Sequence, residues 1–194
     1  MARSGYEFHP LTKDRWRDLE TLFGERGACG GCWCMWWRVP KAEFVERKGE
    51  GNRKALRALV AKGAQLGLLA YAGGEPVGWC AFAPREDYVR LAKARTLKPV
   101  DDQPVWSVTC FFIARGHRGR GLSVALLDAA AEHAARNGAR ILEGYPTATE
   151  SRLPAAFVYT GLPSSFERAG FVEVARRART RPIMRRALRR PRSS

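Results

Sequence analysis

The sequence predicts a mixed α/β fold: one sheet flanked by helices, in a single domain over residues 1–188, followed by a short basic tail over 189–194. Three observations predict it. The chain has 194 residues, 45% of them hydrophobic, which is enough for one buried core. Apolar runs with strand spacing alternate with segments of helical spacing. No internal repeat or linker divides this order, so we expect the strands to share one sheet.

In the first half, the spacing of apolar residues predicts three strands and two helical segments. The second helical segment is expected to break at Gly49-Glu50-Gly51, because glycine ends helices. The last two strands flank Gly73-Gly74-Glu75, a sequence typical of a hairpin turn. The predicted elements are a strand over 6–11, helices over 13–23 and 41–62, and strands over 66–71 and 76–83.

The second half begins with a polar connection and then alternates again. A near-continuous apolar run predicts a strand buried on both faces. The amphipathic helix that follows it is expected to stop at Asn137-Gly138. The predicted elements are a connection over 84–104, a strand over 105–114, a helix over 122–136, a strand over 140–145, a short helix over 163–169, and strands over 172–177 and 182–188.

The most informative stretch is a basic, glycine-rich turn, Arg118-Gly119-Arg120-Gly121, between the apolar strand and the amphipathic helix. The free N–H groups and the positive end of that helix converge on the turn. Glycine lets the backbone approach an anion closely, and the arginines add charge. The turn has neither the Lys-Ser/Thr pair of a P-loop nor the acidic residue of a dinucleotide fingerprint. We therefore expect it to bind a phosphate of a different ligand.

This turn resembles the pyrophosphate-binding signature of the GNAT superfamily of N-acetyltransferases, Arg/Gln-x-x-Gly-x-Gly/Ala, with serine at the last position. Ile141-Leu142-Glu143 and the late Phe166-Glu167-Arg168-Ala169-Gly170-Phe171 follow in the family's order. The resemblance implies a mostly antiparallel central sheet, with two strands splayed by a bulge, and acetyl-CoA as cosubstrate. It also implies that pantetheine pairs with the strand before the turn. The implied cofactor-binding residues are Phe111, Phe112, Ile113, Arg118, Gly119, Arg120, Gly121, Leu122, Ser123 and Val124.

The sequence departs from the family in the residues that transfer protons. The family often uses a glutamate near the bulged strand as base and a tyrosine in the late helix as acid. Phe166 stands at the tyrosine position, and the strand over 105–114 has no carboxylate. Glu143 is the predicted base by position and Tyr159 the predicted acid, with an exposed strand residue and a packing tyrosine as the respective alternatives. Other candidates for the acid are Tyr145, Ser164 and Ser165.

The cysteine- and tryptophan-rich segment over 29–38 is open to three interpretations: a metal site, an acceptor pocket or core. Its three thiols have no nearby fourth ligand, so no metal is predicted. The resemblance places this segment at the acceptor site, where aromatic faces favour a cationic or flat acceptor and an arginine suits a carboxylate. Packing under the sheet is the alternative. The predicted acceptor-binding residues are Trp33, Trp36, Trp37 and Arg38.

Composition restricts the setting in which the protein works. No run approaches the ~20 apolar residues of a membrane span, the first ten residues carry no secretory signal, and five cysteines are a poor disulfide framework. We expect a cytoplasmic protein, monomeric or homodimeric.

The net charge is +15, with nine arginines after residue 175. This basic end is either a solvated end without partners or a source of affinity for nucleic acid.

The resemblance therefore implies an enzyme that moves an acetyl group from acetyl-CoA to the primary amine of a small molecule. A protein lysine or N-terminal amine is the alternative acceptor. The alternative from another class is a non-catalytic module that binds coenzyme A or nucleic acid, favoured by the missing proton-transfer residues.

Overall fold

The seven strands form one sheet. The computed structural model describes residues 5–149 and 154–189, so the predicted tail lies outside the described residues except for Arg189. The sheet order is β1-β2-β3-β4-β5-β7-β6. Only β4 and β5 pair in parallel; the other neighbours are antiparallel, which confirms the mixed, mostly antiparallel sheet. The strands are β1 (Glu7–Pro10), β2 (Gly67–Ala72), β3 (Glu75–Pro84), β4 (Trp106–Ile113), β5 (Ile141–Gly144), β6 (Val172–Arg176) and β7 (Pro182–Ala187).

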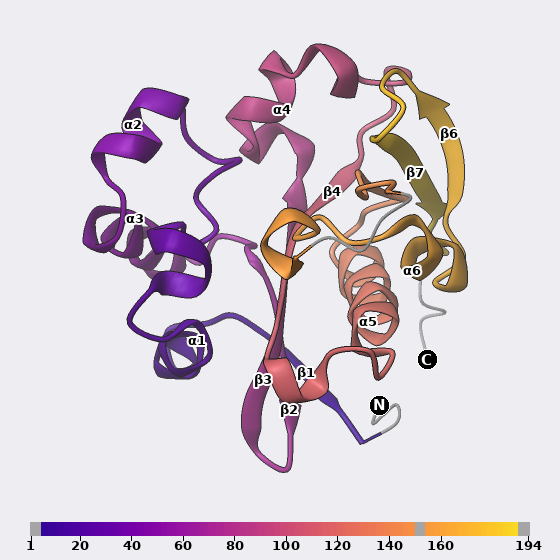
Figure 1. Ribbon diagram of the computed structural model, residues 1–194. Helices are drawn as coiled ribbons and strands as arrows, with labels where there is room; N and C mark the ends of the chain where they lie inside the picture. The colour runs from indigo at the N-terminus through magenta and orange to yellow at the C-terminus, as the bar shows by residue number, and fades with distance from the viewer. Residues whose placement is uncertain (1–4, 150–153, 190–194) are drawn as a thin grey trace.

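Helices cover both faces of this sheet (Figure 1). On one side, α1 and α3 pack on β2 and β3 around a core that includes Trp16, Leu56 and Trp79. On the other side, α5 and α6 pack around a core that includes Leu126 and Phe166. The helices in the described part of the chain include none that is long and apolar enough to span a membrane. The helices are α1 (Trp16–Phe23), α2 (Lys41–Glu46), α3 (Glu50–Ala61), α4 (Val89–Lys93), α5 (Leu122–Arg136) and α6 (Pro163–Arg168).

Helix α5 shows how the sequence sets an element and its position. It begins directly after Gly121, whose φ of 80° is costly for other residues. It ends at Asn137, followed by Gly138 at a φ of 86°, as predicted. Its buried face consists of leucines and alanines, and these small side chains let the helix lie close on the sheet. The position of the helix fixes where its N-terminal N–H groups point.

The segment over 84–104, predicted as a polar connection, is instead a packed part of the fold. It contains α4 and buries Tyr88, Leu91 and Leu97 in a small core with Tyr145 and Ile183. The prediction was wrong because three widely spaced apolar residues among many charges show no periodicity. Their burial depends on partners from β5 and β7, which lie far along the chain.

Strand β4 carries a bulge that opens the sheet. Ala81 pairs with Cys110 while the next residue of β3, Phe82, pairs with Val108, so Thr109 is an extra residue. On the other side, β4 pairs with β5 only from Trp106 to Val108. Beyond this point the two strands separate, which is the splay that the resemblance implied. The opening lies next to the N-terminus of α5.

Five of the arginines that the structure describes near the C-terminus have partners within the fold. The side chain of Arg176 pairs with Glu173, and Arg177 donates to Lys98 O and Pro99 O. Further on, Arg181, Arg185 and Arg186 also donate side-chain hydrogen bonds. The expectation of arginines without partners is wrong for these residues, because β6 and β7 bring them to carboxylates and carbonyls elsewhere in the chain.

Candidate active site

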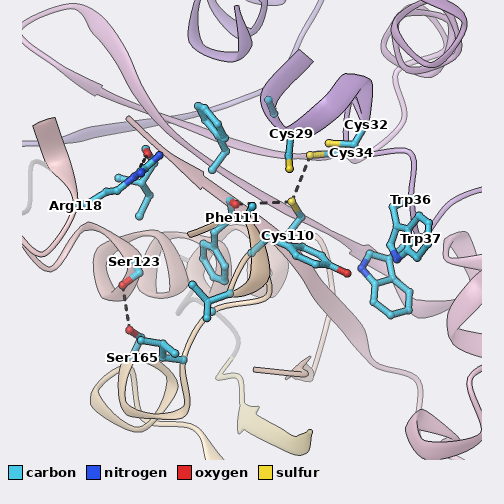
Figure 2. A pocket seen from close by; sticks show the side chains of 18 of the residues that line it. Cys29, Cys32, Cys34, Trp36, Trp37, Cys110, Phe111, Arg118, Ser123 and Ser165 are labelled. Atoms are coloured by element: carbon cyan, nitrogen blue, oxygen red, sulfur yellow. Dashed lines mark hydrogen bonds between the residues drawn. The ribbon is translucent and has the colours of Figure 1, made fainter. Parts of the chain in front are cut away.

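A cavity of about 780 Å³ lies along the free part of β4. One end lies at the basic turn, where Figure 2 shows Arg118 and Ser123, and the other end is formed by Trp36 and Trp37. Cysteine side chains lie between the two ends (Figure 2). The remaining lining residues are Ala28, Cys29, Cys32, Cys34, Phe44, Cys110, Phe111, Phe112, Ile113, Gly119, Ala156, Val158, Tyr159, Gly161, Leu162 and Ser165.

The basic turn end has the features of an anion site. Arg118 and Gly119 line the cavity, and Arg118 Nε donates to Ile113 O at 2.8 Å, which holds the side chain against the end of β4. Ser123 Oγ lies 3.1 Å from Ser165 Oγ, joining the first turn of α5 to α6. The first N–H groups of α5 have no acceptor within the helix and carry the positive end of its dipole. Positive charge and free donors thus meet at one point.

The structure divides the predicted cofactor-binding residues into two groups. Six of them line the cavity: Phe111, Phe112, Ile113, Arg118, Gly119 and Ser123. The lining does not include the other four: Arg120, Gly121, Leu122 and Val124. Leu122 is 1% exposed and belongs to the core, so its side chain cannot contact a ligand, although its backbone N–H opens the helix. Spacing alone could not separate these groups, because helix orientation decides which side chains turn inward.

The free edge of β4 presents backbone groups to the cavity. Phe111 N–H donates to Tyr159 O at 2.6 Å, on the side away from β3. Backbone groups alternate along a strand, so those of Ile113 face the same open side as those of Phe111. Part of this edge is therefore free to bond an extended ligand as an added strand would.

A connecting segment over 158–161 crosses the opening between β4 and β5. Its Gly161 O accepts from Thr147 N–H at 2.8 Å, and Thr160 Oγ1 lies 3.0 Å from Thr147 Oγ1. Arg181 Nη1 donates to Thr160 Oγ1 at 2.7 Å and also bonds Tyr145 O and Thr147 Oγ1. These bonds fix the segment and so position Tyr159 in the cavity wall.

The cysteine-rich segment has a strained backbone. Ala28, Trp33 and Cys34 have φ values of 68°, 43° and 53°, a region that is costly for residues other than glycine. The strain places Cys34 Sγ 3.5 Å from Cys110 Sγ, and Trp79 Nε1 donates to Cys34 Sγ at 3.1 Å. Among the described residues, no group of His, Cys, Asp or Glu is arranged to hold a metal ion.

The tryptophans of this segment divide between core and cavity. Trp36 and Trp37 line the cavity. Trp33 is 4% exposed and stacks on Trp16, with ring centroids 6.0 Å apart. This buried position does not support the prediction that Trp33 contacts the acceptor. The reversed φ at Trp33 explains the difference, because the chain turns there and sends the next side chains to the other side.

Arg38 also lies away from the cavity. Its side chain is 7% exposed, pairs with Asp87 at 3.6 Å and lies over the Tyr88 ring with its guanidinium carbon 4.7 Å from the centroid. It does not line the cavity. Its charge is already compensated by Asp87, so it fits a structural role better than the predicted contact with an acceptor carboxylate.

Comparison with protein families gives one match, to the acetyltransferase (GNAT) family, over residues 33–160. The chain belongs to the GNAT acetyltransferase family. Its match covers the second part of the cysteine-rich segment, the bulged strand and the basic turn. Among curated proteins, none matches the chain.

Solved structures share the GNAT fold at low sequence identity. PaiA N-acetyltransferase from Thermoplasma acidophilum, in complex with coenzyme A, has 12% identity and a TM-score of 0.54, with 96% of this chain and 99% of that chain covered. YncA from Salmonella typhimurium, with acetyl-CoA, has 13% identity and a TM-score of 0.53, covering 98% of each chain. Aminoglycoside N-acetyltransferase AAC(6')-Iy, with coenzyme A, has 18% identity and a TM-score of 0.55, covering 90% and 93%.

In this GNAT chain, Tyr159 lines the cavity and Phe166 does not. Burial raises the pKa of the Tyr159 phenol, so it keeps its proton at neutral pH. Phe166 is fully buried between Gly144 and Gly161, where a Cβ would meet its ring. Of the alternatives, Ser165 lines the cavity, whereas Tyr145 is 1% exposed and lies outside the lining.

Glu143 does not reach the cavity of this GNAT chain. It is 1% exposed, and its carboxylate pairs with Arg185 Nε at 2.7 Å and with Arg85 Nη1 at 3.2 Å. Tyr145 Oη also donates to it and lies 2.8 Å from Ser107 Oγ on β4. The network fits a structural role, because it holds β4, β5 and β7 together just before the splay.

Several cavity residues were missed by sequence reasoning. Cys110 and Phe44 come from β4 and α2, and Leu162 precedes α6. Their only sequence signal was an apolar character, which is shared with core residues. The bulge at Thr109 turns Cys110 toward the cysteine-rich segment, and no motif marks that position.

Substitution of Glu143 by Gln distinguishes a base from a structural residue. Removal of the charge leaves Arg85 without a carboxylate partner and Arg185 with Asp101 alone, so we expect the free energy of unfolding to fall by about 3 kcal/mol. We expect the pH dependence of kcat/KM to keep its shape. Denaturant unfolding and a pH–rate profile measure the two effects, with Glu75→Gln on the exposed hairpin as the control. If a stably folded Glu143→Gln variant instead lost the rise of kcat/KM with pH, Glu143 would be identified as the base.

Proposed function

We propose that the protein is an N-acetyltransferase that transfers an acetyl group from acetyl-CoA to the primary amine of a small molecule. The observation that carries the proposal is one continuous cavity, which joins the basic turn to an aromatic end along the free edge of β4. Family membership supports the acetyl transfer. The enclosed aromatic end supports a small acceptor, because it is lined mainly by side chains that a small molecule would contact.

The residues present fit acetyl-CoA. The turn offers Arg118 and the N–H groups of α5 to a pyrophosphate. Phe111 N–H already bonds Tyr159 O, and Ile113 O accepts from Arg118 Nε, so the Phe111 carbonyl and the Ile113 N–H are the groups left to bond the amides of a pantetheine arm. Two of the solved structures with this fold contain coenzyme A and one contains acetyl-CoA. When bound, acetyl-CoA supplies the thioester that an amine can attack.

The chain's own residues bind and orient the cosubstrate, and one of them supplies a proton. Arg118 and the helix N-terminus hold one end of the cosubstrate, while β4 aligns its arm. Tyr159 lines the cavity and holds a proton on its phenol oxygen, which supports our proposal that it protonates the leaving sulfur. The described residues that line the cavity include no carboxylate or histidine, so we propose that the amine loses its proton to water.

Acetyl transfer is tested by thiol release from acetyl-CoA in the presence of pooled primary amines. We expect release that depends on the amine, together with formation of the N-acetyl product by mass spectrometry. Binding of coenzyme A without turnover over a broad panel of amines would support a non-catalytic module. Turnover only with a protein substrate would contradict the small-molecule acceptor.

Reversal of the charge at residue 118 tests the anion site. Arg118→Glu places a carboxylate at the proposed pyrophosphate position, so we expect coenzyme A to bind at least tenfold more weakly, which is about 1.4 kcal/mol. Isothermal titration calorimetry measures this. Arg17→Glu makes the same charge change on the exposed side of α1 and should leave the affinity near that of the unmodified protein. Equal effects of both substitutions would mean that only net charge matters.

Removal of the Tyr159 hydroxyl tests its role as acid. Acid–base assistance contributes about 10²–10⁴ in rate, so we expect Tyr159→Phe to lower kcat at least tenfold and to leave coenzyme A affinity unchanged. Tyr71→Phe is the matched control, because the Tyr71 hydroxyl bonds Asp18 outside the cavity. If Tyr159→Phe retains full kcat, the phenol only packs and the thiolate leaves without a protein acid.

A further inference from the structure

The aromatic end of the cavity lacks the charges that a polyamine or an aminoglycoside requires. Trp36, Trp37 and Phe44 form its wall, and the Trp36 and Phe44 rings meet edge to face with centroids 5.0 Å apart. Within the described lining, no residue is acidic and Arg118 at the opposite end is the one charged residue. A polycation entering here would lose its hydration without gaining a counter-charge. An acceptor with an apolar or aromatic body fits better.

Arg90 lies immediately behind this wall. It is the second residue of α4, and its guanidinium carbon is 3.5 Å from the centroid of the Trp36 ring. Its backbone N–H donates to Trp37 O at 3.1 Å, which ties α4 to the wall. The Tyr159 phenol and the Arg90 guanidinium are close enough for each to affect the pKa of the other. The cation thus lies against the cavity wall without lining the cavity, and sequence analysis did not single it out.

The Arg90 guanidinium lacks a counter-ion. It forms no ion pair with any residue that the structure describes, and its buried Nη1 has no hydrogen-bond partner. Asp87, three residues earlier, pairs with Arg38 instead. Burial lowers the pKa of Arg90, a sign of incomplete compensation, but an arginine stays charged at neutral pH. The residue as a whole is only half-buried, so part of it remains exposed.

A second donor on the same wall is also unpartnered. The indole Nε1 of Trp37 is buried and has no hydrogen-bond acceptor. Buried indole N–H groups usually have a partner, and an unsatisfied buried donor costs about 1–3 kcal/mol. Two orphan donors, one of them charged, on segments that are joined by a backbone hydrogen bond indicate that a ligand supplies the missing acceptor.

We propose that the acceptor is an amino acid-like amine with an apolar or aromatic side chain, whose carboxylate is bound by Arg90 and the indole N–H of Trp37. This rests on the proposed acetyl transfer and names its substrate class. A carboxylate fits because it can accept from a guanidinium and a further donor at once. The aromatic wall receives the side chain, and the amine is left to face the free edge of β4. Arg90 thereby takes the role that sequence reasoning gave to Arg38.

Product binding tests the carboxylate contact without any dependence on catalysis. We expect N-acetyl-L-tryptophan to bind at least tenfold more weakly to Arg90→Met, about 1.4 kcal/mol, and N-acetyltryptamine, which lacks the carboxylate, to change less than twofold. Calorimetric titration measures both ligands. Arg57→Met is the matched control, because Arg57 lies 6.0 Å from the Trp16 ring centroid and outside the cavity lining. Trp37→Phe retains a ring, removes the N–H and should also weaken N-acetyl-L-tryptophan selectively.

Turnover gives the second readout. L-tryptophan and tryptamine are compared with spermidine and kanamycin, and we expect Arg90→Met to lower kcat/KM at least tenfold for L-tryptophan only. For each amine, kcat/KM of the variant is divided by that of the unmodified protein, so the different basicity of L-tryptophan and tryptamine cancels. Equal losses for L-tryptophan and tryptamine, or preference for a polycation, would overturn the inference and leave acetyl transfer intact. Absence of thiol release with every amine, together with no coenzyme A binding, would instead overturn the proposed function.

Discussion

The bulge at Thr109 is the constraint on which the site depends. A regular β4 would continue its pairing with β5, and every backbone group on that edge would be satisfied. The extra residue ends the pairing after Val108 and leaves the strand with an unpaired edge inside the protein. An exposed edge of this kind is a liability in most sheets, and here it becomes the wall of a cavity beside the N-terminus of α5.

An open sheet needs support on both sides of the opening. Before the splay, Glu143 and its two arginine partners hold β4, β5 and β7 together in the interior. After it, Arg181 fixes the segment over 158–161, and Phe166 fills the space beneath Gly144 and Gly161. These contacts explain why residues that looked catalytic or surface-exposed are structural. The fold uses buried charge and one aromatic ring to keep the strands apart.

Unpaired hydrogen-bond donors lie at both ends of the cavity. The basic turn offers free N–H groups and Arg118 to an anion that belongs to the cosubstrate. The other end combines aromatic faces with Arg90, whose guanidinium lies over the Trp36 ring and has an unpartnered Nη1. Away from the cavity, Arg185 and Arg186 are paired with carboxylates. An excess of donors over acceptors thus occurs where ligands are expected.

The sequence by itself determined most of the elements and the position of the basic turn. Apolar periodicity gave the exact bounds of α5, and Gly119 and Gly121 in a basic turn marked the phosphate end, because these signals are local. Only the tertiary structure decided which side chains meet in the cavity. The fold placed Trp33 in the core and brought Arg90 to the aromatic wall, since contacts between distant segments depend on the bulge, the reversed φ angles and the burial of α4. Local patterns carry no information on such contacts.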